Sequence, residues 1–480
     1  MKISPFASLL LSAIAVIEST TSVNAAAPPP PKGSDLTLEY TFQEYLLDFD
    51  KVDKYNINGE EYQVRKQNFE RNLQHVVEHN AKNSIKGKGE NSIKDKEGGH
   101  TLGVNLFSDY SSEELNQLMG HDKSHRYKEV LLGAGTTTTT ATATARHLRT
   151  TPTTSMKEKE NSHELPLPFD ITDIDTLPEQ VDWTSYSTPI KNQGHCGSCW
   201  AFASTAALES HLAIHVYEDV SHTNTQILSP QEMVSCVDNT NDCGGEGGCK
   251  GATAELAYDT IATIGMILES DFPYTGADTI QCPIRKDPAQ EQTKKKYNDD
   301  IDDWVDDWSD DGDDDDWESP PIVAYLEGYS TLPSNDYKTL MNAVAKYGPV
   351  VIAAAASNWA FYESGIFESP NLELPSAWDI NHGIVVEGYG ADEETGEMFW
   401  LVRNSWGKSW GEGGRIRLKR VDPDDEETDD DDFCGMDLYP EDGTVCQYDD
   451  SGRPIPLAPI KVCGTNGMLF DSVIPVHAYL

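Results

Sequence analysis

Gln-Gly-His-Cys-Gly-Ser-Cys-Trp-Ala-Phe, residues 193–202, is the stretch that decides how this sequence is interpreted. It places a small thiol, Cys199, directly before a run that we expect to be helical from residue 200 to about residue 214. A thiolate at a helix start meets the positive end of the helix dipole, and such a position lowers the pKa of a cysteine. The stretch therefore predicts a nucleophilic thiol. The alternative is a disulfide cysteine in a glycine-rich turn.

The composition narrows the classes of partner. The 480-residue chain carries 81 acidic residues against 36 Lys plus Arg, a formal net charge of −45. A surface this acidic repels phosphates and anionic lipids, so we expect no nucleic-acid or membrane partner. We also expect a monomer.

The N-terminus predicts entry into the secretory pathway. Lys2, an apolar run over residues 6–17 and small residues at 23–25 are typical of a signal peptide, which we assign to residues 1–25. A membrane anchor is the alternative, but the run is too short to span a bilayer. We expect the protein in a lysosome or vacuole, or outside the cell.

The nine cysteines favour disulfides, because an oxidising compartment makes them the default. An odd count leaves one thiol free, and Cys199 is the candidate. Zinc is the rival use, but residues 196–199 form a single Cys-x-x-Cys with no second pair to close a tetrahedral site. We therefore expect neither a metal nor another cofactor. The remaining eight are disulfide candidates: Cys196, Cys236, Cys243, Cys249, Cys282, Cys434, Cys446 and Cys463.

Two motifs lie in the N-terminal third. Polar and apolar residues recur at steps of three and four on a helix expected from about residue 60 to residue 82, and Gly103-x-Asn105-x-Phe107-x-Asp109 follows. This pair resembles the ERFNIN and GNFD motifs of cathepsin L-like propeptides, with Asn68 where the first motif usually has Ile or Val. The helical stripe consists of Glu61, Arg65, Phe69, Asn72, Val76 and Asn80.

Together with the Cys-Gly-Ser-Cys-Trp signature of residues 196–200, these motifs make the chain resemble a papain-family cysteine peptidase in its proenzyme form. The resemblance implies an α+β fold with a helical lobe, a β-barrel-like lobe and an active-site cleft between them, preceded by a helical inhibitory prodomain. It implies a propeptide over residues 26–176, with its inhibitory domain at about 36–120. The peptidase domain would cover residues 177–480.

The resemblance also implies the catalytic residues. Cys199 would be the nucleophile, His382 the general base and acid, and Asn404 the residue that orients the imidazole. Gln193 would donate to the oxyanion. Trp406 would shield the His–Asn hydrogen bond, and Trp410 would line the leaving-group side of the cleft.

Substrate recognition is expected from backbone and pocket residues. Gly251 and Ala252 stand where the family carries a Gly-Gly pair, and Ala353 and Ile384 would wall the pocket for the second residue before the scissile bond. These small, apolar groups predict an apolar substrate side chain. The expected partners are peptide or protein substrates and the chain's own propeptide.

The resemblance pairs Cys236 with Cys282, and Cys196 with Cys249 or, less well, Cys243. The family's cysteine shortly before the histidine is missing, so Cys434 needs another partner, Cys446 or Cys463.

Three segments depart from an ordinary compact enzyme. Residues 134–155 are Thr-rich and predict an accessible linker, with propeptide cleavage between residues 163 and 177. Acidic insertions at 285–320 and 421–432 predict solvated surface loops. Cys199 and His382 are 183 positions apart, whereas about 130 to 150 is usual in the family. The first insertion accounts for the excess.

The function expected is a secreted or lysosomal cysteine endopeptidase made as a zymogen, working through a Cys-His-Asn mechanism and an acyl-enzyme. Two alternatives remain. One is a non-catalytic binding protein on the same scaffold. The other is a calcium or polycation binder that uses the acidic runs.

Overall fold

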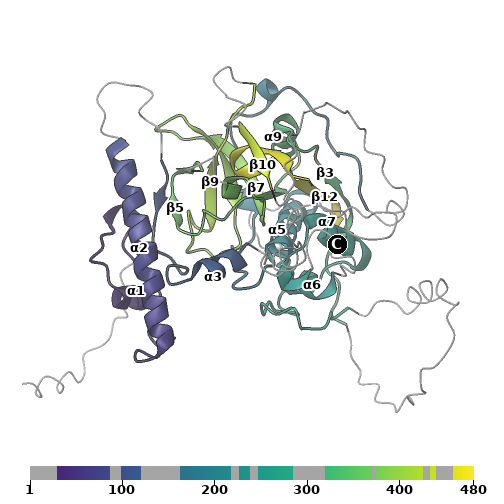
Figure 1. Cartoon of the computed structure of the whole chain (residues 1–480). Helices are drawn as coiled ribbons and strands as arrows, with labels where there is room; N and C mark the ends of the chain where they lie inside the picture. Colours follow the sequence, from purple (N-terminus) through teal and green to yellow (C-terminus); the bar gives the residue numbers. More distant parts are fainter. Residues whose placement is uncertain are drawn as a thin grey trace, which may run out of the picture.

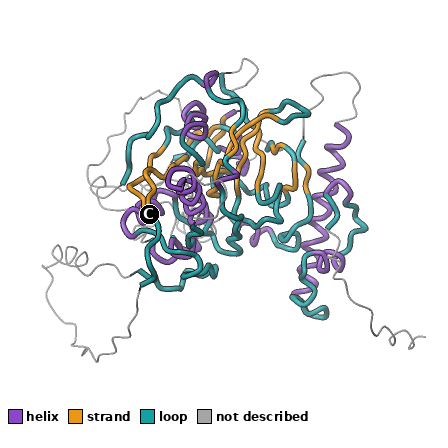
Figure 2. Tube along the Cα trace, turned by 180° about the vertical axis from the view of Figure 1, so that it is seen from behind, coloured by secondary structure: helices purple, strands orange, loops and turns teal. Residues whose placement is uncertain are grey.

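The computed structural model describes residues 30–86, 99–119, 163–217, 226–237, 247–284, 319–369, 375–424, 433–438 and 458–480. The predicted signal peptide, the Thr-rich linker, most of both acidic insertions, Cys243 and Cys446 lie outside these residues. In Figure 1 the helices α1 (Phe42–Asp48) and α2 (Glu60–Lys86) stand on one side of the sheet. Helices α5 (Cys199–Leu212), α6 (Pro230–Cys236) and α7 (Ala254–Ile264) stand on the other. The view from behind in Figure 2 shows the same separation across the strands.

The N-terminal domain is built on two crossing helices, α1 (Phe42–Asp48) and α2 (Glu60–Lys86), followed by β1 (Thr101–Leu102) and α3 (Ser112–Gln117). Thr41 and Glu44 form a capping box that starts α1, and Ser111 with Glu114 starts α3 in the same way. Phe42, Tyr45 and Phe69 stack where the long helices cross, and all three are buried. The apolar stripe of α2 therefore packs on α1, as its spacing predicts.

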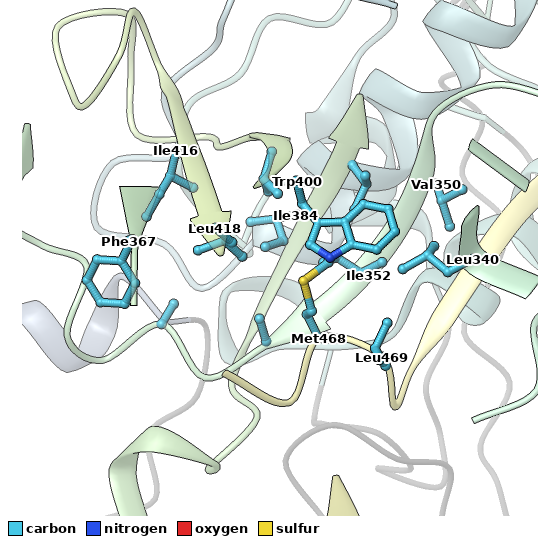
Figure 3. Packing of buried hydrophobic residues seen from close by; sticks show 14 of the residues in the cluster. Leu340, Val350, Ile352, Phe367, Ile384, Trp400, Ile416, Leu418, Met468 and Leu469 are labelled. Carbon is cyan, nitrogen blue, oxygen red and sulfur yellow. The ribbon is translucent and has the colours of Figure 1, made fainter. Parts of the chain in front are cut away.

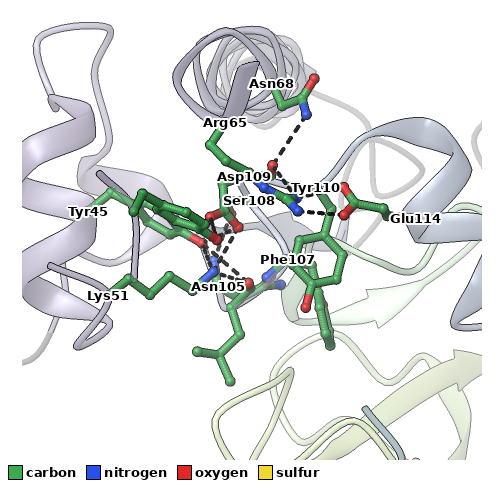
Figure 4. A network of polar contacts seen from close by, with 12 residues as sticks. Tyr45, Lys51, Arg65, Asn68, Asn105, Phe107, Ser108, Asp109, Tyr110 and Glu114 are labelled. Carbon is green, nitrogen blue, oxygen red and sulfur yellow. Dashed lines mark hydrogen bonds and ion pairs between the residues drawn. The ribbon is translucent and has the colours of Figure 1, made fainter. Parts of the chain in front are cut away.

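Asp109 is the centre of a buried polar network beneath these helices (Figure 4). Its carboxylate accepts from Lys51 Nζ at 2.7 Å, from the Tyr45 hydroxyl at 3.0 Å and from the Tyr55 hydroxyl at 2.8 Å. Asn68 Nδ2 donates to the Asp109 carbonyl at 3.3 Å. Asn68, which departs from the usual residue of the first propeptide motif, therefore forms a hydrogen bond to the second motif. The polar residues of the two motifs hold one loop to one helix.

The helical lobe forms around α5 (Cys199–Leu212), whose residues are all buried. Alanines at 201, 203, 206 and 207 allow neighbouring elements to pack close to the helix axis. Helix α6 (Pro230–Cys236) begins after a capping serine, since Ser229 Oγ accepts from Glu232 N at 3.1 Å and proline takes the first position. Helix α7 (Ala254–Ile264) packs on both of the others.

The second lobe is one eight-stranded sheet of order β3-β12-β4-β7-β8-β9-β6, with β2 pairing on β7. Its neighbours are antiparallel except for the parallel pair β6 and β9. The end strands β3 and β6 do not pair, so among the described residues the expected β-barrel-like lobe is an open sheet. The strands are β2 (Val181–Asp182), β3 (Tyr325–Thr331), β4 (Val350–Ala354), β6 (Ile366–Phe367), β7 (His382–Ala391), β8 (Met398–Arg403), β9 (Arg415–Lys419) and β12 (Ser472–Tyr479).

The main core lies on one face of this sheet and under α9 (Tyr337–Lys346). Figure 3 shows Leu340 of α9 beside Val350 and Ile352 of β4, with Trp400 of β8 in the same cluster. Burial of apolar side chains from helix and sheet is the main force that holds these layers together. Outside the main sheet, β5 (Tyr362–Ser364) pairs with β1, and β10 (Cys434–Asp437) pairs with β11 (Ile460–Cys463).

Residues 163–177, here called the docked segment, pack on the sheet lobe. Leu165 N donates to Tyr329 O at 2.6 Å, and Asn342 of α9 exchanges hydrogen bonds with the Thr172 backbone at 2.9 and 3.0 Å. The apolar residues of the segment pack against the main core: Leu165, Leu167, Phe169, Ile174 and Leu177.

None of the helices in the described parts of the chain is both long enough and apolar enough to cross a bilayer.

Candidate active site

Cys199 is the first residue of α5, at the boundary between the two lobes. Its Sγ accepts from the backbone N–H of Gly383 on β7 at 3.4 Å. Gly383 lies against the helix start, since a Cβ added there would be in van der Waals contact with the Trp200 backbone at 3.4 Å. Cys199 is the free cysteine among the described residues. The fold therefore brings a thiol from one lobe against a strand of the other.

His382 and Asn404 complete this arrangement. His382 opens β7, and Asn404 directly follows β8, the strand paired with β7. The His382 Nε2 and Asn404 Oδ1 atoms lie 2.8 Å apart. This bond leaves the other ring nitrogen, Nδ1, buried with no hydrogen-bond partner. The amide thus fixes the ring on one side and leaves one nitrogen available for a proton.

The two tryptophans lie behind the histidine. Trp406 is fully buried and its ring centroid is 4.9 Å from that of His382. Trp410 packs edge-on against Trp406 at 4.9 Å and donates to Ala360 O at 3.2 Å. Trp410 is 1% exposed, so its side chain forms a packing layer and does not line the pocket around Cys199. The expectation that Trp410 lines the leaving-group side of the cleft stays a prediction.

Gln193 connects the site to the N-terminal domain. Its Oε1 accepts from Ser405 Oγ at 2.5 Å, which fixes the amide orientation. Its Nε2 donates to Leu118 O and to Cys196 O, both at 3.0 Å. Because Leu118 belongs to the N-terminal domain, a donor expected to serve a substrate oxygen is already occupied by the chain's own carbonyl.

Burial sets the protonation of the pair in this closed state. Desolvation raises the pKa of the Cys199 thiol to about 11, against three backbone hydrogen bonds that lower it. It also lowers the pKa of His382 to about 4, although the Asn404 hydrogen bond raises it. The expected low thiol pKa is thus not found with the cleft covered, because burial outweighs the helix terminus.

The pocket beside Cys199 has an empty volume of about 540 Å³ and takes its walls from both lobes. Gly251, Ala252 and Ala353 line it, together with Met119 of the N-terminal domain. Ile384 does not. It follows His382 by two positions on the same face of β7 and packs in the main core beside Ile352 (Figure 3).

Asp471 is a pocket residue that sequence reasoning missed. It lies 89 positions after His382 in the chain and carries no motif of its own. The pairing of β12 with β4 brings it there, since Ser472 pairs with Ile352 and Ala353 N donates to Asp471 O at 3.0 Å. Only the sheet register makes this carboxyl a neighbour of the thiol.

Three disulfides frame the site: Cys196–Cys249, Cys236–Cys282 and Cys434–Cys463. The first fastens the turn before Cys199 to the Gly251 loop. The third joins β10 to β11, and thus takes one of the two alternatives left open for Cys434. In the parts of the chain described, no group of His, Cys, Asp or Glu is arranged to hold a metal ion.

The N-terminal domain docks on the sheet lobe by strand pairing and side-chain contacts. Gly103 N donates to Phe361 O at 2.9 Å, and Asn105 Nδ2 to Ala360 O at 2.7 Å. Tyr110 stacks on His195 with ring centroids 5.0 Å apart. From this contact the chain continues to Leu118, whose carbonyl accepts from Gln193, and to Met119, which lines the pocket beside Cys199. The domain is therefore placed to obstruct the cleft.

The thiol, the imidazole–amide pair and the covering domain define a cysteine peptidase with an inhibitory propeptide. The chain belongs to this class. Residues 177–437 match the papain family cysteine protease domain, and residues 42–115 match the cathepsin propeptide inhibitor domain.

Individual relatives agree with this assignment. Fruit bromelain of Ananas comosus is 28% identical over 79% of this chain and 80% of its own length. Procathepsin L of Rattus norvegicus is 29% identical over 76% of this chain and 83% of its own length.

Among solved structures, the recombinant stem bromelain precursor matches with a TM-score of 0.56 and 24% identity over 92% of this chain and 98% of its own. Procathepsin L 3 of Tenebrio molitor larval midgut matches with a TM-score of 0.55 and 23% identity, over 91% of this chain and 99% of its own. These structural matches show that the papain-like proenzyme fold is shared.

Proposed function

We propose that the chain is a zymogen of an endopeptidase in which Cys199 is the nucleophile, His382 the general base and acid, and Asn404 the residue that orients the imidazole. The observation that carries the proposal is the 2.8 Å contact of His382 Nε2 with Asn404 Oδ1, with Nδ1 left unpartnered beside the strand that contacts the Cys199 sulfur. Thiol catalysis requires a nucleophile, a base beside it and a third group that orients the base.

In the opened cleft, proton transfer from Cys199 to His382 Nδ1 gives a thiolate and an imidazolium. The thiolate attacks the peptide carbonyl carbon, and the oxyanion accepts hydrogen bonds from Gln193 Nε2 and the Cys199 backbone N–H. The imidazolium then protonates the leaving amine, and the C–N bond breaks. Water, deprotonated by His382, cleaves the thioester and regenerates the thiol.

The propeptide acts as the intramolecular inhibitor in this proposal. The Leu118 carbonyl takes the hydrogen bond from Gln193 that a substrate oxygen would need, and Met119 stands in the pocket. A substrate must therefore displace both residues.

A test of the catalytic assignment compares the wild-type proenzyme with Cys199→Ser at about pH 4.5 in the presence of a thiol reductant. The wild type should lose its propeptide, hydrolyse a fluorogenic peptide and be labelled by an epoxide thiol inhibitor. Cys199→Ser should do none of these, yet should lose its propeptide when a trace of active wild type is added. Peptide hydrolysis by Cys199→Ser would overturn the assignment.

The boundary between propeptide and enzyme is also a proposal. Sequence patterns favour a start at Leu177, but the docked segment (163–177) is hydrogen bonded to Tyr329 of β3 and Asn342 of α9. A Cβ on Gly328 would lie 2.0 Å from His163 O, so β3 is adapted to this segment. We propose that cleavage falls before His163 and that the docked segment stays with the enzyme.

The secretory route remains a proposal resting on residues 1–25. Expression in a eukaryotic secretory host, followed by N-terminal sequencing of the released proenzyme, tests it. An N-terminus that still begins at Met1 would contradict it.

A further inference from the structure

The two-stranded sheet of β10 (Cys434–Asp437) and β11 (Ile460–Cys463), here called the ribbon, lies outside the main sheet. Cys434 stands opposite Cys463, and a disulfide joins them at one end of the ribbon. Asp437 stands opposite Ile460 at the other end. The thiol mechanism uses none of these residues, yet the ribbon lies against the segment of chain that leads into His382.

The ribbon packs on residues 377–380 through a close apolar contact. A Cβ added to Gly435 would overlap the ring of Trp378, so the strand can lie on that ring because it carries glycine there. On the facing strand, Val462 is fully buried and clusters with Trp378 and Ile380. The segment before His382 is therefore covered by the ribbon.

Polar contacts hold the main chain of the same segment. Ile380 N donates to Asp437 Oδ2 at 3.2 Å, and Asp437 is 1% exposed. A carboxylate is a stronger acceptor for a backbone N–H than a neutral oxygen is. Asn466, in the turn after β11, donates to Ala377 O at 3.4 Å. The chain is thus held at residue 377 and again at residue 380.

These contacts matter because His382 stands at the end of a strand. It is the first residue of β7 and pairs with Ala354, the last residue of β4. Asn381 N adds one bond to Ala354 O at 3.1 Å, and residues 378–381 belong to no strand. The ends of elements open more readily than their centres. The position of His382 relative to Cys199 therefore depends on what holds the chain before it.

We infer that Asp437 is a positioning residue for the catalytic histidine and acts through the main chain of Ile380. The inference rests on the proposed peptidase function. The contact with Asn404 orients the imidazole, whereas the ribbon holds the main chain that carries it. Residues 369–380 contain no cysteine, so the segment has no covalent tie of its own. A misplacement of about 1 Å can cost a catalytic group about 100-fold in rate.

The first test measures kcat and KM of acid-activated enzyme, with active sites counted by an epoxide thiol inhibitor. Asp437→Ala should lower kcat per active site about 10- to 100-fold and leave KM within about threefold. Asp437→Asn keeps an acceptor oxygen and should stay within about fivefold of wild type. The matched control is Met436→Ala, since Met436 neighbours Asp437 on β10 but is 45% exposed, and it should leave kcat unchanged.

The second test follows alkylation of Cys199 by iodoacetamide, because the thiolate is the reactive form. A well-placed imidazolium maintains the thiolate at pH 5.5, whereas at pH 9 the thiol ionises with little help. The alkylation rate at pH 5.5 relative to that at pH 9 should fall about tenfold in Asp437→Ala. Lost stability alone would reduce the number of active sites and leave both this ratio and kcat per site unchanged.

Gly435→Ala pushes the ribbon away from Trp378 and should change both readouts in the same direction. It decides the question by itself if Asp437→Ala does not fold. Wild-type enzyme that neither hydrolyses peptide nor reacts with the epoxide would defeat the proposed function. An active wild type, with kcat per site and alkylation ratio unaltered in these variants, would overturn the positioning role alone.

Discussion

The side-chain amide of Gln193 donates to the main-chain carbonyl of Leu118 across 3.0 Å, from the peptidase domain to the propeptide. The same Nε2 atom also donates to Cys196 O, and Ser405 holds the amide oxygen. The group that would stabilise a substrate oxyanion is thus oriented in the proenzyme and occupied by a carbonyl. Activation need only remove that carbonyl, because the donor itself requires no rearrangement.

Replacing Gln193 tests this relationship. Gln193→Ala removes a donor that is aimed at the oxyanion, so kcat should fall about 100- to 1,000-fold with little change in KM. Steady-state kinetics of the activated enzyme measure the effect. Ser405→Ala, which only loosens the orientation of the amide, should lose about tenfold or less. Equal kcat values for Gln193→Ala and wild type would contradict the role.

The Asp109 network should control the stability of the propeptide domain. Asp109→Asn leaves the buried ammonium of Lys51 uncompensated, at a cost of about 3 to 5 kcal/mol. Thermal unfolding in the Cys199→Ser background, which prevents self-cleavage, should show earlier loss of the propeptide domain. The control is Lys66→Gln, which breaks an exposed pair of 3.7 Å with Glu70 and should cost less than about 1 kcal/mol. Equal losses of stability in Asp109→Asn and Lys66→Gln would contradict the structure.

Acid should loosen the propeptide through buried histidines. Burial lowers the pKa of His100 to about 3 from the ordinary histidine value of 6.5, and His100 packs on Phe367 of the peptidase domain. A histidine whose pKa is lowered by burial in the docked state stays neutral there, and it takes up a proton when the propeptide is released. Docking therefore weakens as pH falls from 6.5 toward 3. Burial also lowers the pKa of His75 and His195.

His100→Phe keeps an aromatic ring but cannot titrate, so the midpoint pH of self-activation should move down by about one unit. Timed electrophoresis across a pH series measures this. Glu363, which accepts from Gly33 N at 2.9 Å and has its pKa raised by burial, works in the opposite direction and limits the shift. His477→Gln, on the far strand β12, should leave the midpoint unchanged. An unchanged midpoint for His100→Phe would remove His100 from the acid response.

The docked segment should remain on the mature enzyme. Sequencing of the acid-activated protein should find an N-terminus at or before His163. An enzyme cut at an engineered site before Leu177 should lose apolar packing by Leu165, Phe169 and Ile174, and its Tm should fall by about 5 °C or more. An enzyme cut at an engineered site before His163 is the control. A natural start at Leu177 with an unchanged Tm would contradict the proposal.

Local sequence predicted the elements that carry local signals. The helix at Cys199 and the long helix of the N-terminal domain both formed where their patterns indicated. The pairing of Cys196 with Cys249 was one of two alternatives, since a one-dimensional pattern does not specify which loop returns to the turn. The open sheet was not predicted, because closure depends on whether distant end strands meet.

The sequence by itself determined the family of this protein and the residue types at the thiol, imidazole and amide, because each lies in a motif whose neighbours shape it. The tertiary structure alone decided three relationships: Leu118 against Gln193, Ile384 in the core, and Asp471 in the pocket beside Cys199. The reason is physical. Each depends on sheet register or on the docking of two domains, and such contacts join residues whose separation along the chain leaves no local pattern.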